Sequence, residues 1–191
     1  RCLKQLGVRE IPLLIITHGH ADHIAGWPGV KKGRHIAQTW YQNVKRGATA
    51  HIESTKGPVK IEVLWPDSGS YDPNNSSIAV RITTKDYSLF AGGDMEPLTQ
   101  SVIAPTLREV DIYKVCHHGS AYQDQLFTRA LSPQVAMISV GAGNSYGHPA
   151  PATLELLAQA GAKVLRTDRD GAIAISARNH RLKVRTSRSK L

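Results

Sequence analysis

The sequence predicts an α/β fold with a functional site at the ends of its strands. Apolar runs of strand length alternate with segments of helical spacing, and four of the runs end in glycine beside a histidine, aspartate or asparagine. Helices placed between strands that end in polar residues are typical of α/β sheets, where those residues gather at one edge. No apolar stretch approaches the ~20 residues of a membrane-spanning helix.

The first half of the chain is predicted to consist mainly of strands, which are aliphatic and separated by turn-forming residues such as those from Pro66 to Asn75. The rest of the thirty residues after Trp40 is predicted to be irregular. The expected elements are the end of a helix over 1–6 that stops at Gly7, strands over 12–17, 34–40 and 59–65, a short helix or turn over 24–27, and a hairpin over 77–83 and 87–91.

The second half is predicted to alternate helices with strands. The clearest helix starts near Pro151, spaces its apolar residues by three and four, and ends at Gly161. After Ser176, the basic end of the chain is predicted to be a solvated tail. The expected elements are helices over 97–107, 123–131 and 151–161, and strands over 111–116, 135–140, 164–165 and 172–176.

Length and composition favour a globular protein. At 191 residues the chain is long enough for one sizeable core, so we expect a single domain over residues 1–191. Hydrophobic residues make up 41% of it and charged residues 20%, which excludes an intrinsically disordered chain. Because it opens at Arg1 with no signal peptide, we expect a fragment of a larger protein. The two cysteines, Cys2 and Cys116, form no metal or redox motif.

The net charge of +9 points to anionic partners. Nucleic acids, phospholipid head groups and phosphorylated substrates all attract a basic protein. Six of the lysines and arginines fall within the last fourteen residues. A charged end by itself is usually only solvated, so the charge supports a DNA partner only in combination with a site that acts on phosphoesters.

Such a site is indicated by the segment His18-Gly19-His20-Ala21-Asp22-His23, which directly follows the predicted strand over 12–17. Imidazoles and carboxylates are ligands of zinc, manganese and iron. Four of them on one tight turn can address two metal ions, the usual means of hydrolysing phosphoesters or activated carbonyls. A solvated histidine-rich loop is the alternative, but such loops rarely follow a buried strand.

Three further strands are predicted to end in similar clusters. Gly92-Gly93-Asp94 follows one of them, and His117-His118-Gly119-Ser120 follows the next. The third cluster, from Gly141 to Pro149, contains Asn144 and His148. Chance readily explains one strand that ends in a glycine and a ligand-type residue, but four of them together predict one shared site.

The first histidine motif together with Gly93-Asp94 resembles the metallo-β-lactamase superfamily. Three later blocks, from Val115 to Ser120, from Ser139 to Pro149 and from Leu165 to Ile173, resemble the C-terminal lactamase-like domain of the ComEC/Rec2 DNA-internalisation proteins. The resemblance runs from about Leu13 to Ile175. It implies an αββα sandwich with a two-metal site at one edge.

The resemblance also implies roles for individual residues. The implied metal ligands are His18 and His20 for one ion, Asp22, His23 and His118 for the other, and Asp94 as the bridge between them. The implied catalytic residues are Asp22, His117 and His148. His148 would bind a phosphate or protonate the leaving oxygen, and it could instead be a loop histidine next to the following helix.

His117 would either contact a metal directly or orient a ligand through a hydrogen bond. Ser120 and Asn144 are expected to contact phosphate.

Two departures from the superfamily pattern stand out. Several strands normally precede the first motif, so we expect this chain to lack its N-terminal strands. The segment Asn74-Asn75-Ser76-Ser77 has no histidine where many members supply one, and one metal would then have few protein ligands.

The function implied is a metal-dependent nuclease that acts on DNA during natural transformation, with two divalent ions, zinc or manganese, as cofactors. A hydroxide between the ions would attack phosphorus. The implied partners are DNA, read without regard to base sequence, and the rest of a membrane channel, with the domain on the extracytoplasmic face. Two alternatives stay open: a hydrolase of small phosphoesters, lactones or thioesters, and a non-catalytic DNA-binding module.

Overall fold

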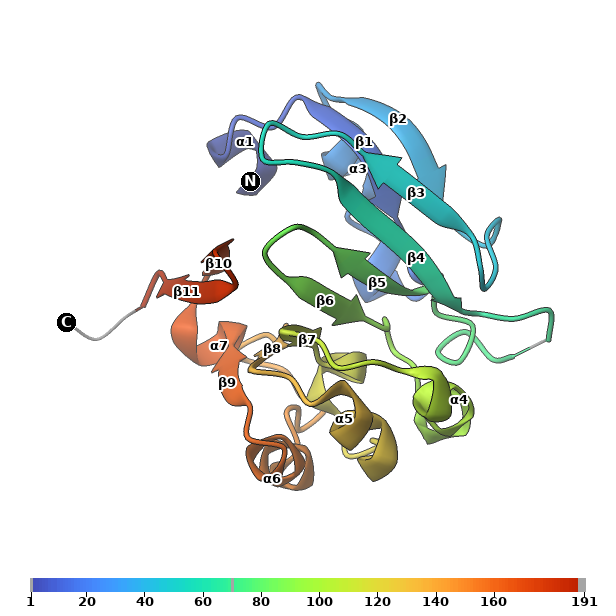
Figure 1. Ribbon diagram of the computed structural model, residues 1–191, viewed down its shortest axis with the longest axis vertical. Helices are drawn as coiled ribbons and strands as arrows, with labels where there is room; N and C mark the ends of the chain where they lie inside the picture. Colours follow the sequence, from blue (N-terminus) through green and yellow to red (C-terminus); the bar gives the residue numbers. More distant parts are fainter. Residues whose placement is uncertain (1, 70, 189–191) are drawn as a thin grey trace.

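The structure, a computed structural model, describes residues 2–69 and 71–188. Its central element is a seven-stranded mixed sheet in the order β3-β4-β5-β6-β7-β8-β9, accompanied by the separate pairs β1–β2 and β10–β11 (Figure 1). The elements, in chain order, are α1 (Cys2–Gln5), β1 (Glu10–Ile15), α2 (Ala21–Ile24), α3 (Trp27–Lys31), β2 (His35–Trp40), β3 (Thr49–Ile52), β4 (Val59–Trp65), β5 (Ala79–Thr83), β6 (Ser88–Ala91), α4 (Pro97–Ile103), η1 (Ala104–Thr106), β7 (Ile112–Lys114), η2 (Cys116–Gly119), α5 (Gln125–Leu131), β8 (Val135–Ile138), α6 (Pro151–Gln159), β9 (Lys163–Arg166), α7 (Thr167–Asp170), β10 (Ile173–Arg178) and β11 (Arg181–Thr186).

The direction of the strands brings the polar loops together. Strands β3 to β6 pair antiparallel, whereas β6, β7, β8 and β9 pair parallel, so the loops after the parallel strands leave the sheet at the same edge. Backbone hydrogen bonds tie the loops after β6 and β7 to each other, and tie the segment before β5 to the loop after β1. Ile78 N–H donates to the carbonyl of Thr17, and His117 N–H donates to the carbonyl of Gly93.

The larger hydrophobic core lies between this sheet and the helices α4, α5 and α6, which cover one of its faces (Figure 1). Phe90 and Tyr113 from the sheet meet Phe127 from α5, and all three rings are fully buried. The rings of Phe90 and Phe127 pack edge to face with centroids 5.4 Å apart, the arrangement that aromatic quadrupoles favour. This core holds the strand ends in fixed positions.

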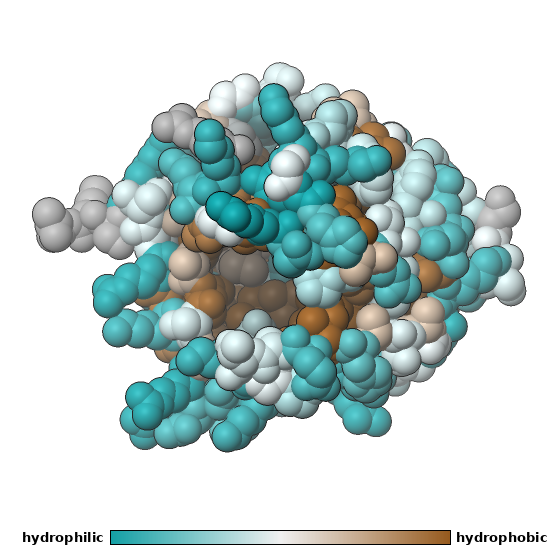
Figure 2. Space-filling model, turned by 90° about the horizontal axis from the view of Figure 1, so that it is seen from above, coloured by the Kyte–Doolittle hydropathy of each residue, from teal (hydrophilic) through white to brown (hydrophobic). Residues whose placement is uncertain are grey.

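A second, smaller core lies between the β1–β2 pair and the strands β4 and β5. Its buried members are Trp40 from β2, Ile61 and Val63 from β4, and Ile78 and Val80 from the segment that forms β5. Many of the side chains that pack against it are only partly buried, Leu13 and Ile15 of β1 among them. Figure 2 shows the molecule from above, with a hollow whose floor is hydrophobic and whose rim is hydrophilic.

Most of the predicted elements are present. The predicted hairpin over 77–83 and 87–91 forms as β5 and β6, and the predicted helix that begins at Pro151 forms as α6. The predicted helix over 97–107 ends early, because the turn from Ala104 to Thr106 tightens into a 3₁₀ helix at Pro105. Among the described residues, no helix combines the length and apolar character needed to cross a membrane.

Two predictions about the backbone were wrong. The thirty residues after Trp40 are not irregular outside β4, because Thr49–Ile52 forms β3 and pairs with β4. The basic end is not a plain solvated tail, because Arg181–Thr186 forms β11 and pairs with β10. Both strands draw their stability from a neighbour rather than from strong local propensity. Ser189, Lys190 and Leu191, which end the predicted tail, lie outside the described residues.

The start of α5 offers a test of how the helix layer is held. The Asp124 carboxylate accepts a hydrogen bond of 2.6 Å from Phe127 N–H and thereby caps the helix. We expect Asp124→Ala to destabilise the protein by about 1 kcal/mol, or roughly 2–4 °C in thermal midpoint, because a helical N–H loses its acceptor. Calorimetry of this variant beside Asp124→Ser, which keeps a capping oxygen, checks it. Equal losses in both variants would contradict the capping role.

Candidate metal centre

The first histidine motif forms a tight turn between β1 and α2. His18 lies just beyond the end of β1 and is 2% exposed, whereas His20 is exposed at the N-cap of α2. The helix α2 then carries Asp22, which is exposed, and His23, which is half-buried. One short segment therefore presents ligand atoms at several depths, from the buried strand end to the surface.

Four side chains from three separate loops converge next to this turn. The cluster consists of Asp22, His23, Asp94 and His118, and one ligand atom from each lies within 4.8 Å of the others. The Nε2 atom of His23 is 3.1 Å from Asp94 Oδ1 and 3.1 Å from His118 Nε2. The Nε2 atom of His118 is 3.3 Å from Asp22 Oδ2. These are the residues predicted to hold the second metal, together with the predicted bridge.

The hydrogen bond made by His118 determines which of its nitrogens is free to bind a metal. Its Nδ1 atom lies 2.7 Å from the carbonyl oxygen of Ser139. A carbonyl can only accept, so Nδ1 carries the proton and the neutral ring keeps a bare lone pair on Nε2. That lone pair points into the cluster. A protein group that fixes the tautomer of a histidine in this way is typical of metal ligands.

His18 and His20 lie beside the cluster. The two rings contact each other through His18 Nε2 and His20 Nδ1, 3.1 Å apart, and His18 Nε2 is 3.9 Å from Asp94 Oδ2. The other nitrogen of His18 lies 3.2 Å from both Ser77 Oγ and Thr17 Oγ1. Burial and the neighbouring His23 lower the pKa of His18 to about 4, so this ring is neutral and able to act as a ligand at neutral pH.

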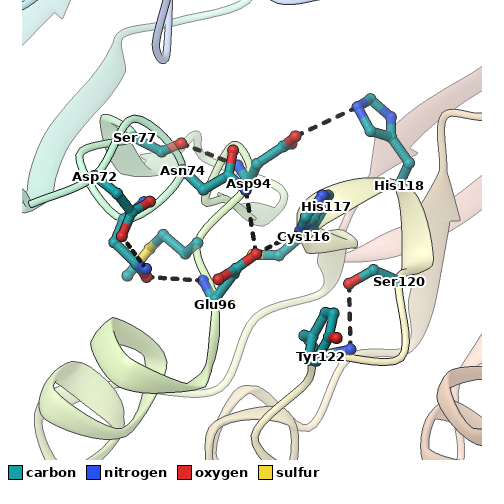
Figure 3. A network of polar contacts seen from close by, with 12 residues as sticks. Asp72, Asn74, Ser77, Asp94, Glu96, Cys116, His117, His118, Ser120 and Tyr122 are labelled. Carbon is teal, nitrogen blue, oxygen red and sulfur yellow. Dashed lines mark hydrogen bonds and ion pairs between the residues drawn. The ribbon is translucent and has the colours of Figure 1, made fainter. Parts of the chain in front are cut away.

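Asp94 is the most deeply buried acidic group of the site, with 3% of its surface exposed. Burial by itself would raise its pKa, but the opposing effects of His23, His118 and His117 hold the pKa at about 2. Figure 3 shows its carboxylate directed toward His118, while its N–H donates to Ser77 Oγ at 3.0 Å. Within the described part of the chain, Asp94 Oδ1 has no hydrogen-bond donor of suitable geometry.

The donor set fits a divalent cation. Histidine lone pairs and a charged carboxylate meet in a buried space, where they repel one another unless a cation or protons lie between them. Asp94 in particular carries a buried oxygen without a hydrogen bond among the described residues. The chemistry of the site therefore matches metal binding.

The preceding residue, Gly93, adopts a left-handed conformation with φ of +59°. A Cβ atom here would lie 2.7 Å from Ser77 Cβ and 2.8 Å from Thr17 Cβ. Only glycine therefore allows the loop to bring Asp94 this close to the end of β1. His117 and His118 also have positive φ values, 48° and 51°, so the second ligand loop is sharply turned as well.

His117 faces away from the four-residue cluster. Its Nδ1 atom is 3.2 Å from Glu96 Oε1, and its ring lies edge-on to His148 with centroids 5.7 Å apart. Burial, followed by the neighbouring His117 and His118, lowers the pKa of His148. The ring of Tyr146, which is 82% exposed, stacks against His148 at 6.0 Å.

The cluster opens into a cavity of about 410 Å³. Asp22 and His118 form one side of it, and the loop from Gly141 to His148 forms another. Asn144 holds this loop together, since its amide donates to the carbonyls of Gly141 and His148 and accepts from His148 N–H. Its role as a phosphate contact stays a prediction.

Ser120 lies outside this cavity lining and is 1% exposed. Its hydroxyl accepts a hydrogen bond from Tyr122 N–H, and its carbonyl accepts one from Thr153 Oγ1. In this arrangement Ser120 supports the loop after His118. Its predicted contact with phosphate would require the hydroxyl to become accessible.

Four residues of the site escaped the sequence analysis. Thr17, Ser77 and Glu96 contact predicted site histidines, and Tyr146 stacks on another. Hydroxyl and carboxylate groups that orient histidines have no spacing rule of their own, because their partners come from distant parts of the chain. Ser77 lies in the segment where a histidine was sought, and its hydroxyl faces His18 instead.

Comparisons with known proteins agree with this geometry. The Metallo-beta-lactamase superfamily matches residues 1–141 of the sequence, about three quarters of the chain. The chain belongs to the metallo-β-lactamase superfamily. Two solved structures with 18% identity share the fold: a proposed metal-dependent hydrolase from Parabacteroides distasonis, with a TM-score of 0.55 over 84% of this chain and 77% of that one, and a metallo hydrolase from Ignicoccus hospitalis, with a TM-score of 0.52 over 81% and 75%.

Three curated bacterial proteins are similar in sequence. They are ComE operon protein 3 of Bacillus subtilis, 29% identical over 93% of this chain; Competence protein ComA of Neisseria gonorrhoeae, 28% identical over 90%; and Recombination protein 2 of Haemophilus influenzae, 25% identical over 93%. The chain spans about a quarter of the length of each, namely 26%, 26% and 24%. The predicted superfamily, fold class and resemblance to competence proteins are therefore confirmed.

The bridging role predicted for Asp94 can be tested by metal content. We expect Asp94→Asn to lose at least one divalent ion per chain, because the neutral amide lacks the negative charge with which the carboxylate would bind the metal. Mass spectrometry of metals in the purified protein measures this, with Glu109→Gln, an exposed carboxylate outside the cluster, as the matched control. An unchanged metal content in Asp94→Asn would overturn the assignment.

The low pKa of His18 makes the metal-free protein sensitive to acid. Between about pH 4 and 6.5 the unfolded chain protonates His18 while the folded chain does not, so stability should fall as pH drops through this range, by at most about 1.4 kcal/mol per pH unit. Asp94 adds no slope there, since its lowered pKa affects stability only below its ordinary value of 3.8. Urea unfolding in chelator at several pH values measures the trend.

The exposed His180 provides the control, because His180→Gln should leave the slope unchanged. His18→Asn should flatten it. If that variant fails to fold, an NMR titration of the His18 ring in the unaltered chain gives the same information. A midpoint near 6.5 would contradict the effect of burial.

Proposed function

We propose that this chain is a metal-dependent hydrolase that cleaves phosphodiester bonds of DNA during DNA uptake. The observation that carries the proposal is the cluster of Asp22, His23, Asp94 and His118, of which Asp22 and His118 line one side of an open cavity. Metal ligands that open into a cavity leave room for a substrate group next to the metal. The chain belongs to the metallo-β-lactamase superfamily and shares its fold with a metallo hydrolase, and both observations support hydrolysis as the reaction.

DNA as the substrate is supported by two independent features. Two of the three similar curated proteins are named for competence and the third for recombination, and all three match over at least 90% of this chain. The chain also has a net charge of +9, which attracts a polyanion. We propose that it works as part of a longer protein, because the similar proteins are about four times its length. Its setting in a membrane channel, on the extracytoplasmic face, is proposed from the resemblance to the ComEC/Rec2 proteins.

The residues around the cavity would divide the work. His18, His20, His23, Asp22, Asp94 and His118 would hold divalent cations, which when bound activate water and offset the charge of a phosphate group. His148 has a lowered pKa and is neutral at neutral pH, so its ring N–H would donate a hydrogen bond to a phosphate oxygen. Glu96 would position His117 through their contact of 3.2 Å.

A small-molecule substrate is the second candidate, favoured by the size of the cavity. Its volume of about 410 Å³ falls within the range of pockets that enclose small ligands. Tyr146 favours DNA as the substrate, because an aromatic ring that is 82% exposed beside the cavity can stack on a nucleobase.

The proposal predicts that the purified chain, supplied with Mn²⁺ or Zn²⁺, degrades DNA without base specificity, since phosphate contacts carry no base information. His148→Ala should lower turnover by roughly 10²-fold or more while its metal content stays unchanged, because the residue acts on the substrate. His51→Ala, in an exposed histidine on β3, is the matched control and should behave as the unaltered chain. Gel analysis of labelled DNA and metal analysis of each variant give the two readouts.

Either of two results would contradict the proposal and favour another function. Hydrolysis of a small diester such as bis(p-nitrophenyl) phosphate without any cleavage of DNA would favour the small-molecule hydrolase. Binding of DNA by the metal-loaded chain without cleavage of either substrate would favour a non-catalytic binding module.

A further inference from the structure

The outward face of the β10–β11 hairpin carries an unusual concentration of positive charge. In the register of the hairpin, Arg178 lies opposite Arg181, Ser176 opposite Lys183 and Ala174 opposite Arg185. All six side chains are exposed, and the alternate residues of both strands are partly buried. One face therefore presents four cations beside two small side chains.

This arrangement does not serve the stability of the hairpin. Like charges directly opposite each other on paired strands are destabilising, as is the case for Arg178 and Arg181. Within the described residues, none of the four cations forms an ion pair with a carboxylate. The carboxylate of Asp86 accepts a hydrogen bond from the backbone of Asn179 at the hairpin turn. The cations are thus free to bind an external anion.

The positive charge of the chain is concentrated in this C-terminal segment rather than spread evenly along the sequence. From Gly171 to the end, the sequence holds six lysines and arginines and no aspartate or glutamate. It therefore supplies six of the nine net positive charges, and the preceding 170 residues supply only three.

The spacing of the cations favours a polyanion over a single phosphate. Arg181, Lys183 and Arg185 are alternate residues of one strand, so their Cα atoms lie ~7 Å apart in a row. A row of this kind cannot converge on one small anion, but it matches a partner whose negative charges repeat along a chain. The face has no exposed aromatic or large aliphatic side chain, so it lacks the groups that insert into a membrane surface.

Further cations lie between the inner face of the hairpin and the helix α7. A cavity of about 480 Å³ between β9, α7 and β11 is lined by Lys163, Arg169 and Arg188, and the Asp170 carboxylate there accepts a hydrogen bond from Arg166 N–H. Arg188 is tied to α7 through the carbonyl of Asp168. The first residue of α7, Thr167, lines the cavity of the metal centre.

We propose that the outward face of the β10–β11 hairpin, with Arg178, Arg181, Lys183 and Arg185, binds the phosphate backbone of the DNA that the metal centre cleaves. This inference rests on the proposed function. The hairpin would hold the strand through its phosphates, to which arginine and lysine side chains commonly bind. It would supply affinity, and the metal centre would supply the reaction.

The test removes three of these cations at once. The variant with Arg181→Gln, Lys183→Gln and Arg185→Gln is compared with a matched variant that has Lys32→Gln, Lys45→Gln and Lys56→Gln, three exposed cations elsewhere on the surface. Binding of a fluorescent oligothymidylate to the full 191-residue chain is measured in EDTA, so that no cleavage occurs. Circular dichroism checks that both variants fold.

We expect the hairpin variant to bind at least about tenfold more weakly, and the magnitude of its salt slope to fall by about 2, because each lost phosphate contact in single-stranded DNA removes ~0.7 from the slope. The matched variant should change much less. Equal losses in the two variants would mean that only the overall charge matters and would overturn the proposal.

Two further outcomes separate this proposal from others. If the hairpin variant retains DNA binding but loses binding to phosphatidylglycerol vesicles, the face is a membrane contact and the proposal fails. If the unaltered chain binds DNA through the hairpin but cleaves no phosphodiester with added metal, the binding face stands and the proposed nuclease function fails. Cleavage of DNA by the hairpin variant with an unchanged KM would leave the nuclease standing and overturn the binding face.

Discussion

The buried carboxylate of Asp94 is the constraint on which the rest of the site depends. A charge that is 3% exposed is costly unless positive or hydrogen-bonding groups surround it. Here the compensating groups come from different loops: His23 from the turn after β1, and His117 and His118 from the loop after β7. The carboxylate can therefore stay charged only if three segments far apart in the sequence meet at one place.

The sheet meets this requirement through strand direction. Because β6, β7 and β8 run parallel, their following loops lie at one edge, and backbone hydrogen bonds join those loops to each other. Ile78, just before β5, bonds to Thr17 after β1. The remaining distance is closed by the left-handed conformation of Gly93, where any side chain would collide with Ser77 and Thr17. Hydroxyl groups of the same two residues then contact the Nδ1 atoms of His18 and His23. Ser77 and Thr17 therefore limit how Gly93 approaches β1, and they also orient the rings of the two histidines.

The groups proposed for chemistry and the groups proposed to bind DNA are carried by separate parts of the fold. Histidines and carboxylates occupy loops anchored by buried strands, where their positions are fixed by the core. The arginines and lysines of the hairpin stand on an exposed two-stranded ribbon that pairs with no other described strand. A rigid centre keeps ligand geometry precise, whereas phosphate contacts tolerate variation because charge acts over ~8 Å in physiological salt. Substitutions in the hairpin should consequently alter affinity without altering the reaction.

The sequence by itself determined the superfamily and the strands and helices with strong local patterns, and it pointed to candidate ligand residues that stand next to one another. His18, His20, Asp22 and His23 could be identified because one turn carries all four, and the apolar strand before them indicates where the turn lies. Asp94 and His118 could be assigned through short motifs after strands. These signals are local: the residues concerned are neighbours in the sequence, so their spacing can be recognised without the structure.

Only the tertiary structure decided which residues support those ligands and which face carries the free charge. Ser77 and His18 are 59 positions apart, and His118 depends on the carbonyl of Ser139, which any residue could supply. The strand β11 was missed because its charges suggested a tail, although Leu182 and Val184 alternate with charged residues as in a half-buried strand that pairs with β10. Contacts between distant segments have no spacing in the sequence, so they become visible only once the sheet has brought the segments together.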